Sequence, residues 1–256
     1  MIRAKHFLWQ VEGKVGVITL NRPEKKNPLT FESYAELRDL FTRLKTEENV
    51  KTVVVHGAGG NFCAGFDLKE LAAGSGNRLS EDGQGPMGPT RMALTKPVIA
   101  AIEGYAVAGG LELALWCDLR VAATDATLGV FNRRFGVPLI DLGTIRLPRM
   151  IGQGRAMDLI LTGRPVAADE ALRIGLVERL AEPGLALEEA RKLAGQIANF
   201  PPGALRADRR SVLGQWALGM DEAMRAEYRG GVELLASGEA QEGARRFAEG
   251  AGRHGA

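Results

Sequence analysis

Short runs rich in β-branched residues alternate with longer amphipathic segments along most of this chain. This alternation is typical of repeated α/β units, in contrast to a fold whose strands and helices occupy separate halves. The predicted strands cover residues 15–20, 50–57 and 97–102. A helix is predicted at residues 31–44, and another is expected to begin after Gly109-Gly110 and to run through Trp116. The pattern therefore predicts the α/β class.

The last third of the chain has a different pattern, because nearly all of it has helical periodicity. The predicted helices there cover residues 188–200, 204–216, 221–236 and 239–250. We therefore expect two parts, a core at residues 1–184 and a helical region at residues 185–256. Within the core, glycine and proline are frequent between residues 72 and 89, which predicts a mobile loop at a site.

Composition excludes several classes of protein. Of the 256 residues, 45% are hydrophobic and 25% are charged, and 33 basic against 31 acidic residues give a net charge of +2. This balance is typical of an ordinary globular protein, and it provides no strong field to attract nucleic acid. The longest apolar stretch, residues 97–116, contains Glu103 and Glu112, so we exclude it as a membrane span.

Further exclusions come from cysteine content and from short motifs. Cys63 and Cys117 are too few for a disulfide framework or a zinc cluster, and the first residues lack the apolar segment of a secretory signal. The glycine-rich residues 57–60 lack the Lys and the Ser or Thr of a phosphate-binding loop. We expect a cytoplasmic protein with no metal site and no membrane or nucleic-acid partner.

Two glycine-containing segments combine features of a catalytic site. Gly109 and Gly110 are predicted to open a helix, so their N–H groups are unpaired donors at the positive end of the helix dipole. In the earlier segment, Asp67 and Glu70 have the spacing of a capping box, which predicts a helix starting at Leu68. The Ala64-Gly65 amides would then lie in the preceding turn, and two amides from two loops can form an oxyanion hole.

Several motifs in order carry a resemblance to a known family. They are ITLNRPE at residues 18–24, NPL at 27–29, FCAGFDL at 62–68, KPVIAA at 96–101, GGLELA at 109–114, CDLR at 117–120, LTG at 161–163 and GLVE at 175–178. Together they resemble the crotonase (enoyl-CoA hydratase/isomerase) superfamily over about residues 8–250.

The resemblance implies a crotonase-like spiral of ββα units with a C-terminal helical trimerisation region, assembled as a homotrimer or as a hexamer of two trimers. It also implies an acyl-CoA thioester substrate. We expect no cofactor, because coenzyme A is part of that substrate. By motif position, the thioester oxygen is implied to lie between the N–H groups of Ala64 and Gly109. Each such donor typically stabilises the developing enolate by roughly 3–4 kcal/mol. The implied CoA-binding residues are Arg22, Lys25, Lys26, Ala64, Gly65, Phe66, Asp67, Leu68 and Gly109.

The acid–base residues depart from the family pattern. Family hydratases use two glutamates, of which Glu112 matches the first, whereas the second falls on Asn132. Asn132 can orient a water but cannot exchange a proton. General acid–base help is typically worth 10²–10⁴-fold in rate, so this replacement should weaken or redirect hydration. Asp141 is the candidate substitute as a catalytic acid. The alternative is a structural role, as a turn or cap residue or in an ion pair with Arg133, Arg134 or Arg146.

The leading hypothesis is an enoyl-CoA hydratase-like enzyme in which Glu112 moves the proton. Alternatives are an enoyl-CoA isomerase or another crotonase chemistry that uses Glu112 with or without Asp141. A further alternative is a non-catalytic acyl-CoA-binding subunit, which the missing second glutamate makes admissible. RNA binding is disfavoured by the charge of +2 and by the lack of a lysine-rich stripe.

Overall fold

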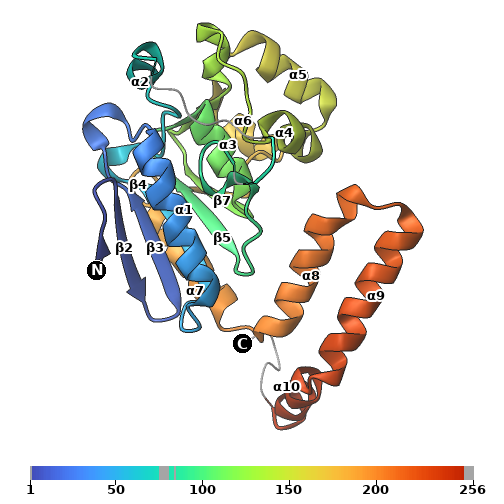
Figure 1. The fold of residues 1–256 in the computed structure, drawn as a ribbon. Helices are drawn as coiled ribbons and strands as arrows, with labels where there is room; N and C mark the ends of the chain where they lie inside the picture. The colour runs from blue at the N-terminus through green and yellow to red at the C-terminus, as the bar shows by residue number, and fades with distance from the viewer. Residues whose placement is uncertain (1, 75–80, 84, 251–256) are drawn as a thin grey trace. The chain divides into compact units, whose positions relative to one another are not determined.

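A seven-stranded sheet forms the centre of the first part of the chain in the computed structural model, which describes residues 2–74, 81–83 and 85–250. Its order is β1-β2-β3-β4-β5-β7-β10 (Figure 1). The strands are β1 (Ile2–Arg3), β2 (Phe7–Glu12), β3 (Val15–Leu20), β4 (Thr52–Gly57), β5 (Val98–Ile102), β7 (Leu119–Ala123) and β10 (Arg179–Ala181). The β1–β2 and β2–β3 pairs are antiparallel, and every later neighbour is parallel.

The predicted strands are confirmed, with small differences at their ends. β4 begins at Thr52 rather than at residue 50, and β5 at Val98 rather than at Pro97. All five residues of β5 are buried, as is typical of central parallel strands covered on both faces. A second sheet has the order β6-β8-β9, with β6 (Tyr105–Val107), β8 (Thr127–Gly129) and β9 (Val166–Ala167).

Helix α1 (Phe31–Thr46) lies against the large sheet and matches the prediction closely (Figure 1). Thr30 and Ser33 form a capping box at its start. Its buried face includes Tyr34, Leu37 and Phe41, and the Phe41 ring packs edge-on against Trp116 at the end of α3 (Gly109–Trp116). Helix α1 therefore joins the sheet to the buried helix α3.

The short helix α2 (Leu68–Ala72) begins where the sequence predicts, but its capping box does not form. Asp67 Oδ1 accepts the Lys69 N–H at 3.2 Å. Glu70 Oε2 instead accepts the Phe31 N–H at 3.2 Å, so this carboxylate links α2 to the first turn of α1. The remaining helices of this part are α4 (Gly143–Ile151), α5 (Gln153–Thr162), α6 (Ala168–Arg173) and α7 (Ala186–Ala198), with short 3-10 helices η1 (Pro23–Lys25), η2 (Ala58–Gly60), η3 (Pro89–Arg91) and η4 (Phe131–Phe135).

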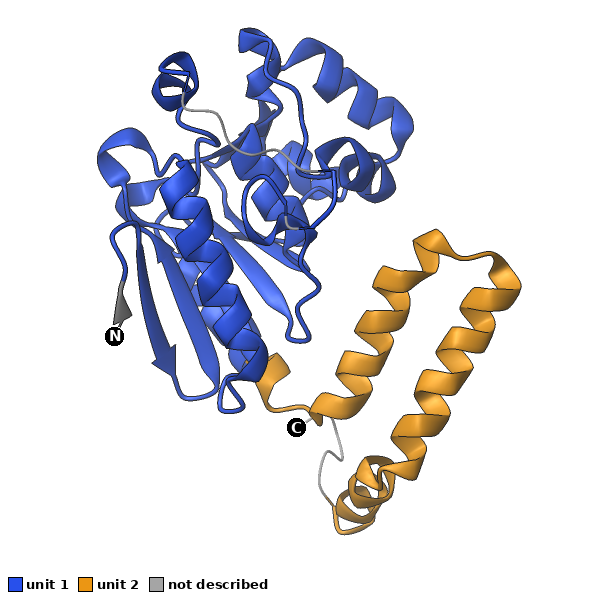
Figure 2. Ribbon diagram, viewed as in Figure 1, with its two compact units in different colours: residues 1–195 blue, residues 196–256 orange. Residues whose placement is uncertain are grey.

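The chain forms two compact units, residues 1–195 and residues 196–256 (Figure 2). The division falls after residue 195 rather than after residue 184, because most of α7 packs in the first unit. Ala186, Ala190 and Ala194 of this helix are buried, and the Thr52 hydroxyl of β4 donates to the Ala194 carbonyl at 3.1 Å. Helix α7 therefore belongs to the α/β core.

The second unit is helical, as the sequence predicts, with α8 (Pro202–Gly214), η5 (Gln215–Ala217), α9 (Met220–Ala236) and α10 (Glu239–Ala248). The Glu239 carboxylate accepts the N–H groups of Gly203 and Ala204 at 2.9 Å each, which ties the start of α10 to the start of α8. No helix in the described part of the chain combines the length and the hydropathy that crossing a bilayer requires. Residues 75–80 and 84 of the predicted loop lie outside the described residues.

Candidate active site

A cavity of about 570 Å³ opens in the first unit, where α1, α2, α3 and η4 meet. This volume lies within the range typical of small-molecule sites. Its wall includes Phe31, Tyr34, Ala64, Phe66, Met87, Gly109, Glu112, Phe131, Asn132, Phe135 and Asp141. The cavity therefore contains all five predicted catalytic residues.

The predicted oxyanion donors lie where two backbone segments approach closely. Gly109 is the first residue of α3, so its N–H has no acceptor inside the helix and lies at the positive end of the helix dipole. Gly65 has a φ of 90°, and a Cβ at this position would lie 2.8 Å from the Gly109 nitrogen. Only glycine at position 65 therefore lets the two segments meet in this way.

The prediction of Ala64 as the first donor is wrong, because its N–H donates to the Lys26 carbonyl at 3.0 Å. Two residues later, the Phe66 N–H donates to no acceptor among the described residues. Phe66 also lines the cavity, and its neighbours Gly65 and Asp67 are both held to Leu29, which fixes the peptide between them. The unpaired amide of this turn is therefore that of Phe66.

Glu112 lies in the first turn of α3 and is only 3% exposed. Its Oε1 accepts the N–H groups of Asp141 and Gly143, both at 2.9 Å. Burial, and then the nearby Asp141 carboxyl, raise the pKa of Glu112 to about 7. A Cβ at Gly143 would lie 2.8 Å from Glu112 Oε1, so glycine is needed there for the close approach. No donor in the described ranges reaches Oε2, which is left for the cavity.

Asp141 is 1% exposed, and its Oδ1 accepts the Met87 N–H at 2.8 Å and the Thr90 hydroxyl. Burial raises the pKa of this carboxyl, although the hydrogen bonds from Thr90 and Met87 oppose the rise. Arg146 donates to the backbone carbonyls of Asp141 and Thr90, at 3.2 and 2.6 Å. These contacts join η3 to the start of α4 beside Glu112.

The alternative for Asp141, an ion pair with Arg133, Arg134 or Arg146, does not form among the described residues. Arg133 donates to the Ile160 carbonyl at 3.1 Å, and Arg134 donates to the Gly163 carbonyl at 2.8 Å. The Arg134 guanidinium also lies over the Phe131 ring, 3.7 Å from its centroid. Both side chains are therefore occupied at the end of α5.

Asn132 is buried at the cavity wall, and its Nδ2 donates to the Val137 carbonyl at 2.8 Å. Its Oδ1 accepts no hydrogen bond from any described group, although it is buried. A buried acceptor without a donor costs free energy, which a bound water or a ligand can recover. Asn132 therefore brings an unused acceptor to the cavity wall, and its match to the family's second glutamate stays a prediction.

The predicted CoA-contact residues form a second cluster around Asp67. Arg22 donates to the Asp67 carboxylate at 3.0 Å, and the Lys25 ammonium lies 3.7 Å from the same oxygen. Burial alone would raise the pKa of Asp67, but the Arg22 and Lys69 hydrogen bonds and the Lys25 charge lower it overall. The Lys26 ammonium lies 4.0 Å above the Tyr105 ring. The basic groups are thus gathered near the α2 turn, and their contact with CoA stays a prediction.

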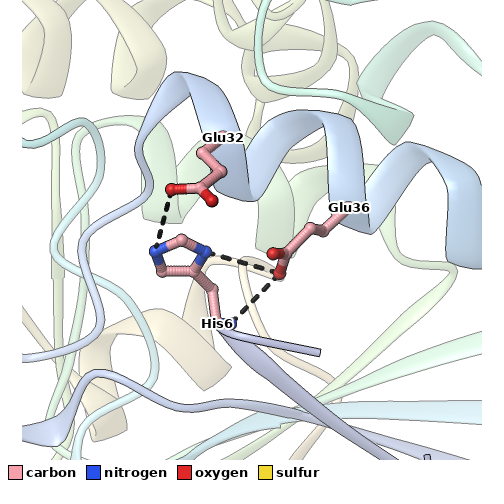
Figure 3. A group of neighbouring side chains, drawn as sticks. All are labelled: His6, Glu32 and Glu36. Atoms are coloured by element: carbon pink, nitrogen blue, oxygen red, sulfur yellow. Dashed lines mark hydrogen bonds and ion pairs between the residues drawn. The ribbon is translucent and has the colours of Figure 1, made fainter. Parts of the chain in front are cut away.

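A separate group of titratable side chains surrounds His6 (Figure 3). The ring lies between two glutamates of α1, with Nε2 3.9 Å from Glu32 Oε2 and Nδ1 3.4 Å from Glu36 Oε2. The Lys5 ammonium lies 2.6 Å from Glu32, and the His6 backbone N–H donates to Glu36 at 3.1 Å. Each carboxylate already has a protein donor, so this cluster is explained as a clasp between α1 and the residues before β2.

Two residues of the site are not identified by the sequence motifs. Thr90 and Met87 hold Asp141, yet Met87 lies in the glycine- and proline-rich residues 72–89 and Thr90 directly follows them, and no spacing pattern singles out either residue. The Phe66 amide is adjacent to the predicted Ala64-Gly65 pair. Its N–H is available to a ligand because the Lys26 carbonyl accepts the N–H of Ala64 instead.

Fold and cavity together define a crotonase-type α/β protein with a buried glutamate beside two unpaired amides. A family model described as enoyl-CoA hydratase/isomerase matches residues 10–253, and the chain belongs to this family. It is 42% identical over 211 residues to (E)-benzylidenesuccinyl-CoA hydratase of Thauera aromatica, covering 80% of this chain and 82% of that relative. It is 35% identical over 218 residues to the short-chain-enoyl-CoA hydratase of Clostridium acetobutylicum, covering 81% and 80%.

Solved structures agree with the family assignment. An enoyl-CoA hydratase of Mycobacterium tuberculosis H37Rv superposes with a TM-score of 0.90 at 37% identity and covers 96% of each chain. The crotonase fold predicted from the motifs is therefore confirmed.

Proposed function

We propose that this protein is an enoyl-CoA hydratase, which adds water across the double bond of a 2-enoyl-CoA. The observation that carries the proposal is the Glu112 carboxyl, which is buried in the cavity with its pKa raised to about 7. Two backbone N–H groups hold one of its oxygens and leave the other for the reaction. A general acid–base group works best when its pKa lies near the working pH.

The thioester oxygen binds between the N–H groups of Phe66 and Gly109 in this proposal. Both amides belong to the cavity wall, and the Gly109 amide also has the favourable end of the α3 dipole. As the water oxygen bonds to C3 of the enoyl group, the electron pair of the double bond moves toward the thioester and forms an enolate. Donors fixed before the reaction stabilise that charge at no cost of reorganisation.

The protons move between the water, two carboxyls and C2. Ionised Glu112 takes a proton from the attacking water, while the Asn132 oxygen accepts the water's other hydrogen. Asp141, whose pKa is raised by burial, is the proposed acid: it delivers a proton to C2, and Glu112 then returns the water's proton to it. The net change is the addition of one hydrogen and one hydroxyl. Asp141 thus takes the place of the second glutamate, and the reaction needs no cofactor beyond the substrate's own coenzyme A.

Ultraviolet absorbance of the conjugated enoyl thioester tests this function. We expect the absorbance to decay with the wild-type protein and to remain constant with Glu112→Gln, which keeps the size of the side chain but cannot accept the proton. The matched control is Glu48→Gln, because Glu48 is an exposed glutamate outside the cavity. Full activity of Glu112→Gln would place the proton carrier elsewhere.

An isomerase is the second candidate, since Asn132 cannot exchange a proton and Glu112 alone can move one between C4 and C2. A 3-enoyl-CoA would then gain conjugated absorbance without uptake of water. Tight acyl-CoA binding with neither reaction would instead support a non-catalytic subunit.

Assembly as a homotrimer, or a hexamer of two trimers, is supported by the second unit. No described residue of α8, α9 or α10 is buried within the chain. Large apolar side chains are exposed on these helices, among them Met220 (84%) and Tyr228 (73%). Such apolar surface is typical of subunit contacts. Sedimentation velocity tests the assembly.

Both cysteines are free and buried, which agrees with our proposal of a cytoplasmic location.

A further inference from the structure

We infer that the acyl site selects neutral aromatic thioesters, of the 3-aryl-2-enoyl class, and discriminates against acyl groups that carry a second carboxylate. This inference rests on the acyl-CoA binding proposed above and names the substrate class for the same cavity. It follows from three properties of the wall: its aromatic rings, its size and its charge.

Three aromatic rings form one part of the cavity wall. Phe31 and Phe66 have ring centroids 4.8 Å apart, and Tyr34 stacks on Phe66 at 5.7 Å. Phe31 and Tyr34 come from the first turn of α1, whereas Phe66 follows the Gly65 turn, so two elements fix the rings in place. Because Phe66 also supplies the proposed oxyanion amide, this cluster lies next to the thioester.

Two further aromatic residues come from η4, the segment that also contains Asn132. Phe131 is held from outside by the Arg134 guanidinium, which is itself bonded to the Gly163 carbonyl. Phe135 is 65% exposed although it lines the cavity, so it offers a ring at the mouth. Aromatic pairs prefer edge-to-face or offset arrangements, and fixed rings from two sides favour a planar aryl group over a flexible chain.

The size of the cavity permits an aryl group. An apolar cavity of about 150 Å³ is enough to bind benzene. The volume here is about 570 Å³, which leaves space for the conjugated enoyl thioester as well. Volume alone would also admit a straight alkyl chain, so the selectivity is assigned to the rings.

The charge of the wall argues against a second carboxylate on the acyl group. Among the described residues that line the cavity, none is Lys, Arg or His, and the two with an acidic side chain are Glu112 and Asp141. Arg133 and Arg134 lie nearby in sequence, but both are bonded to carbonyls of the α5 end. A second carboxylate would lose its hydration without gaining a cation, and it would face two acidic groups. We therefore expect this protein to prefer acyl groups without a second carboxylate, whereas the name of the Thauera aromatica relative, (E)-benzylidenesuccinyl-CoA hydratase, implies a succinyl substrate.

Isothermal titration with saturated thioesters tests the inference, because such ligands bind without turnover. The probes are 3-phenylpropanoyl-CoA, heptanoyl-CoA, in which a butyl group replaces the ring, and benzylsuccinyl-CoA, which adds a carboxymethyl group and with it a second carboxylate. We expect the phenyl compound to bind about three- to tenfold more tightly than heptanoyl-CoA. We expect benzylsuccinyl-CoA to bind at least about tenfold more weakly than the phenyl compound. Equal or reversed order in either comparison overturns the inference.

A pair of variants in α1 assigns the selectivity to the cavity. Phe31→Leu removes a ring from the wall and is expected to bring the phenyl-to-heptanoyl affinity ratio close to one. The matched control is Phe41→Leu, which removes a ring from the same helix where it packs on Trp116, outside the cavity. That control is expected to leave the ratio unchanged even if it lowers the melting temperature. An unchanged ratio in Phe31→Leu contradicts the assignment.

These binding data also separate the inference from the proposed function. Selective binding of the phenyl compound without hydration of any 2-enoyl-CoA, cinnamoyl-CoA included, would support the inference and refute the hydratase. Rapid hydration of short alkyl enoyl-CoAs with no preference for the aryl ligand would support the hydratase and refute the inference.

Discussion

Gly65→Ala is the substitution that most directly tests the pairing of the Phe66 and Gly109 amides. A Cβ at position 65 would lie 2.8 Å from the Gly109 nitrogen and 3.0 Å from Ala108 Cβ, and the first of these distances is shorter than a real Cβ atom tolerates. Because both neighbours belong to backbone or to a short side chain, one of the two amides must move. Removal of one oxyanion donor typically lowers kcat about 10²–10³-fold, and we expect a loss of this size.

Strain must be separated from the loss of the donor, because alanine at a φ of 90° is itself unfavourable. Gly152→Ala is the matched control, since Gly152 has a φ of 83° and a methyl group added there would have nothing within 4 Å. Steady-state kinetics gives kcat, and thermal unfolding gives the melting temperature. We expect both variants to lose stability and only Gly65→Ala to lose catalysis. Equal kcat in the two variants would refute the paired-amide argument.

Three further predictions concern the acid–base groups. The pKa of Glu112 is raised from 4.5 to about 7 in the folded protein. Between pH 4.5 and about pH 7 the folded protein therefore keeps a proton on Glu112 that the unfolded chain has lost. As the pH rises through this range, the free energy of unfolding should fall by about 3 kcal/mol. Glu112→Gln should remove that fall in urea titrations, and wild-type kcat should rise with pH through about 7 as the base ionises. Thr90→Val removes a donor to Asp141, so the pKa of Asp141 should rise further and the pH profile of kcat should shift upward; an unchanged profile argues against Asp141 in proton transfer. Asn132→Glu should raise the hydration rate if its oxygen already holds the water, and no gain would contradict that placement.

Local patterns were sufficient to predict the elements that carry the site. Helix α1 is an example, because the apolar spacing of Tyr34, Leu37 and Phe41 and the Thr30 cap are both local properties of the sequence. Helix α3 is another, since the Gly109-Gly110 pair opens it as expected. Both elements appear within two residues of their predicted starts.

The choice between the Ala64 and Phe66 amides could not be made from local patterns. Lys26 and Asn27 adopt left-handed backbone conformations, with φ of 64° and 55°, and the Asn27 side chain bonds to carbonyls at residues 58 and 61. This turn presents the Lys26 carbonyl to Ala64 rather than to Phe66. The outcome depends on a contact between segments far apart in the chain, for which no spacing rule exists.

Asp141 contacts Glu112 through its backbone and is itself the proposed acid through its side chain, so one residue links the proposed acid to the proposed base. Its backbone N–H orients Glu112, while its carboxyl is held by Met87 and Thr90, which lie 54 and 51 residues away in sequence. A shift of η3 would therefore move the proposed acid and one of the two donors to the proposed base together. Asn132 has no such link, since the one hydrogen bond that its side chain makes among the described residues is to Val137 within the same turn. The position of the Asp141 carboxyl is thus coupled to that of Glu112 through one residue, as a proton relay between the two carboxyls requires, whereas Asn132 is left to orient the water.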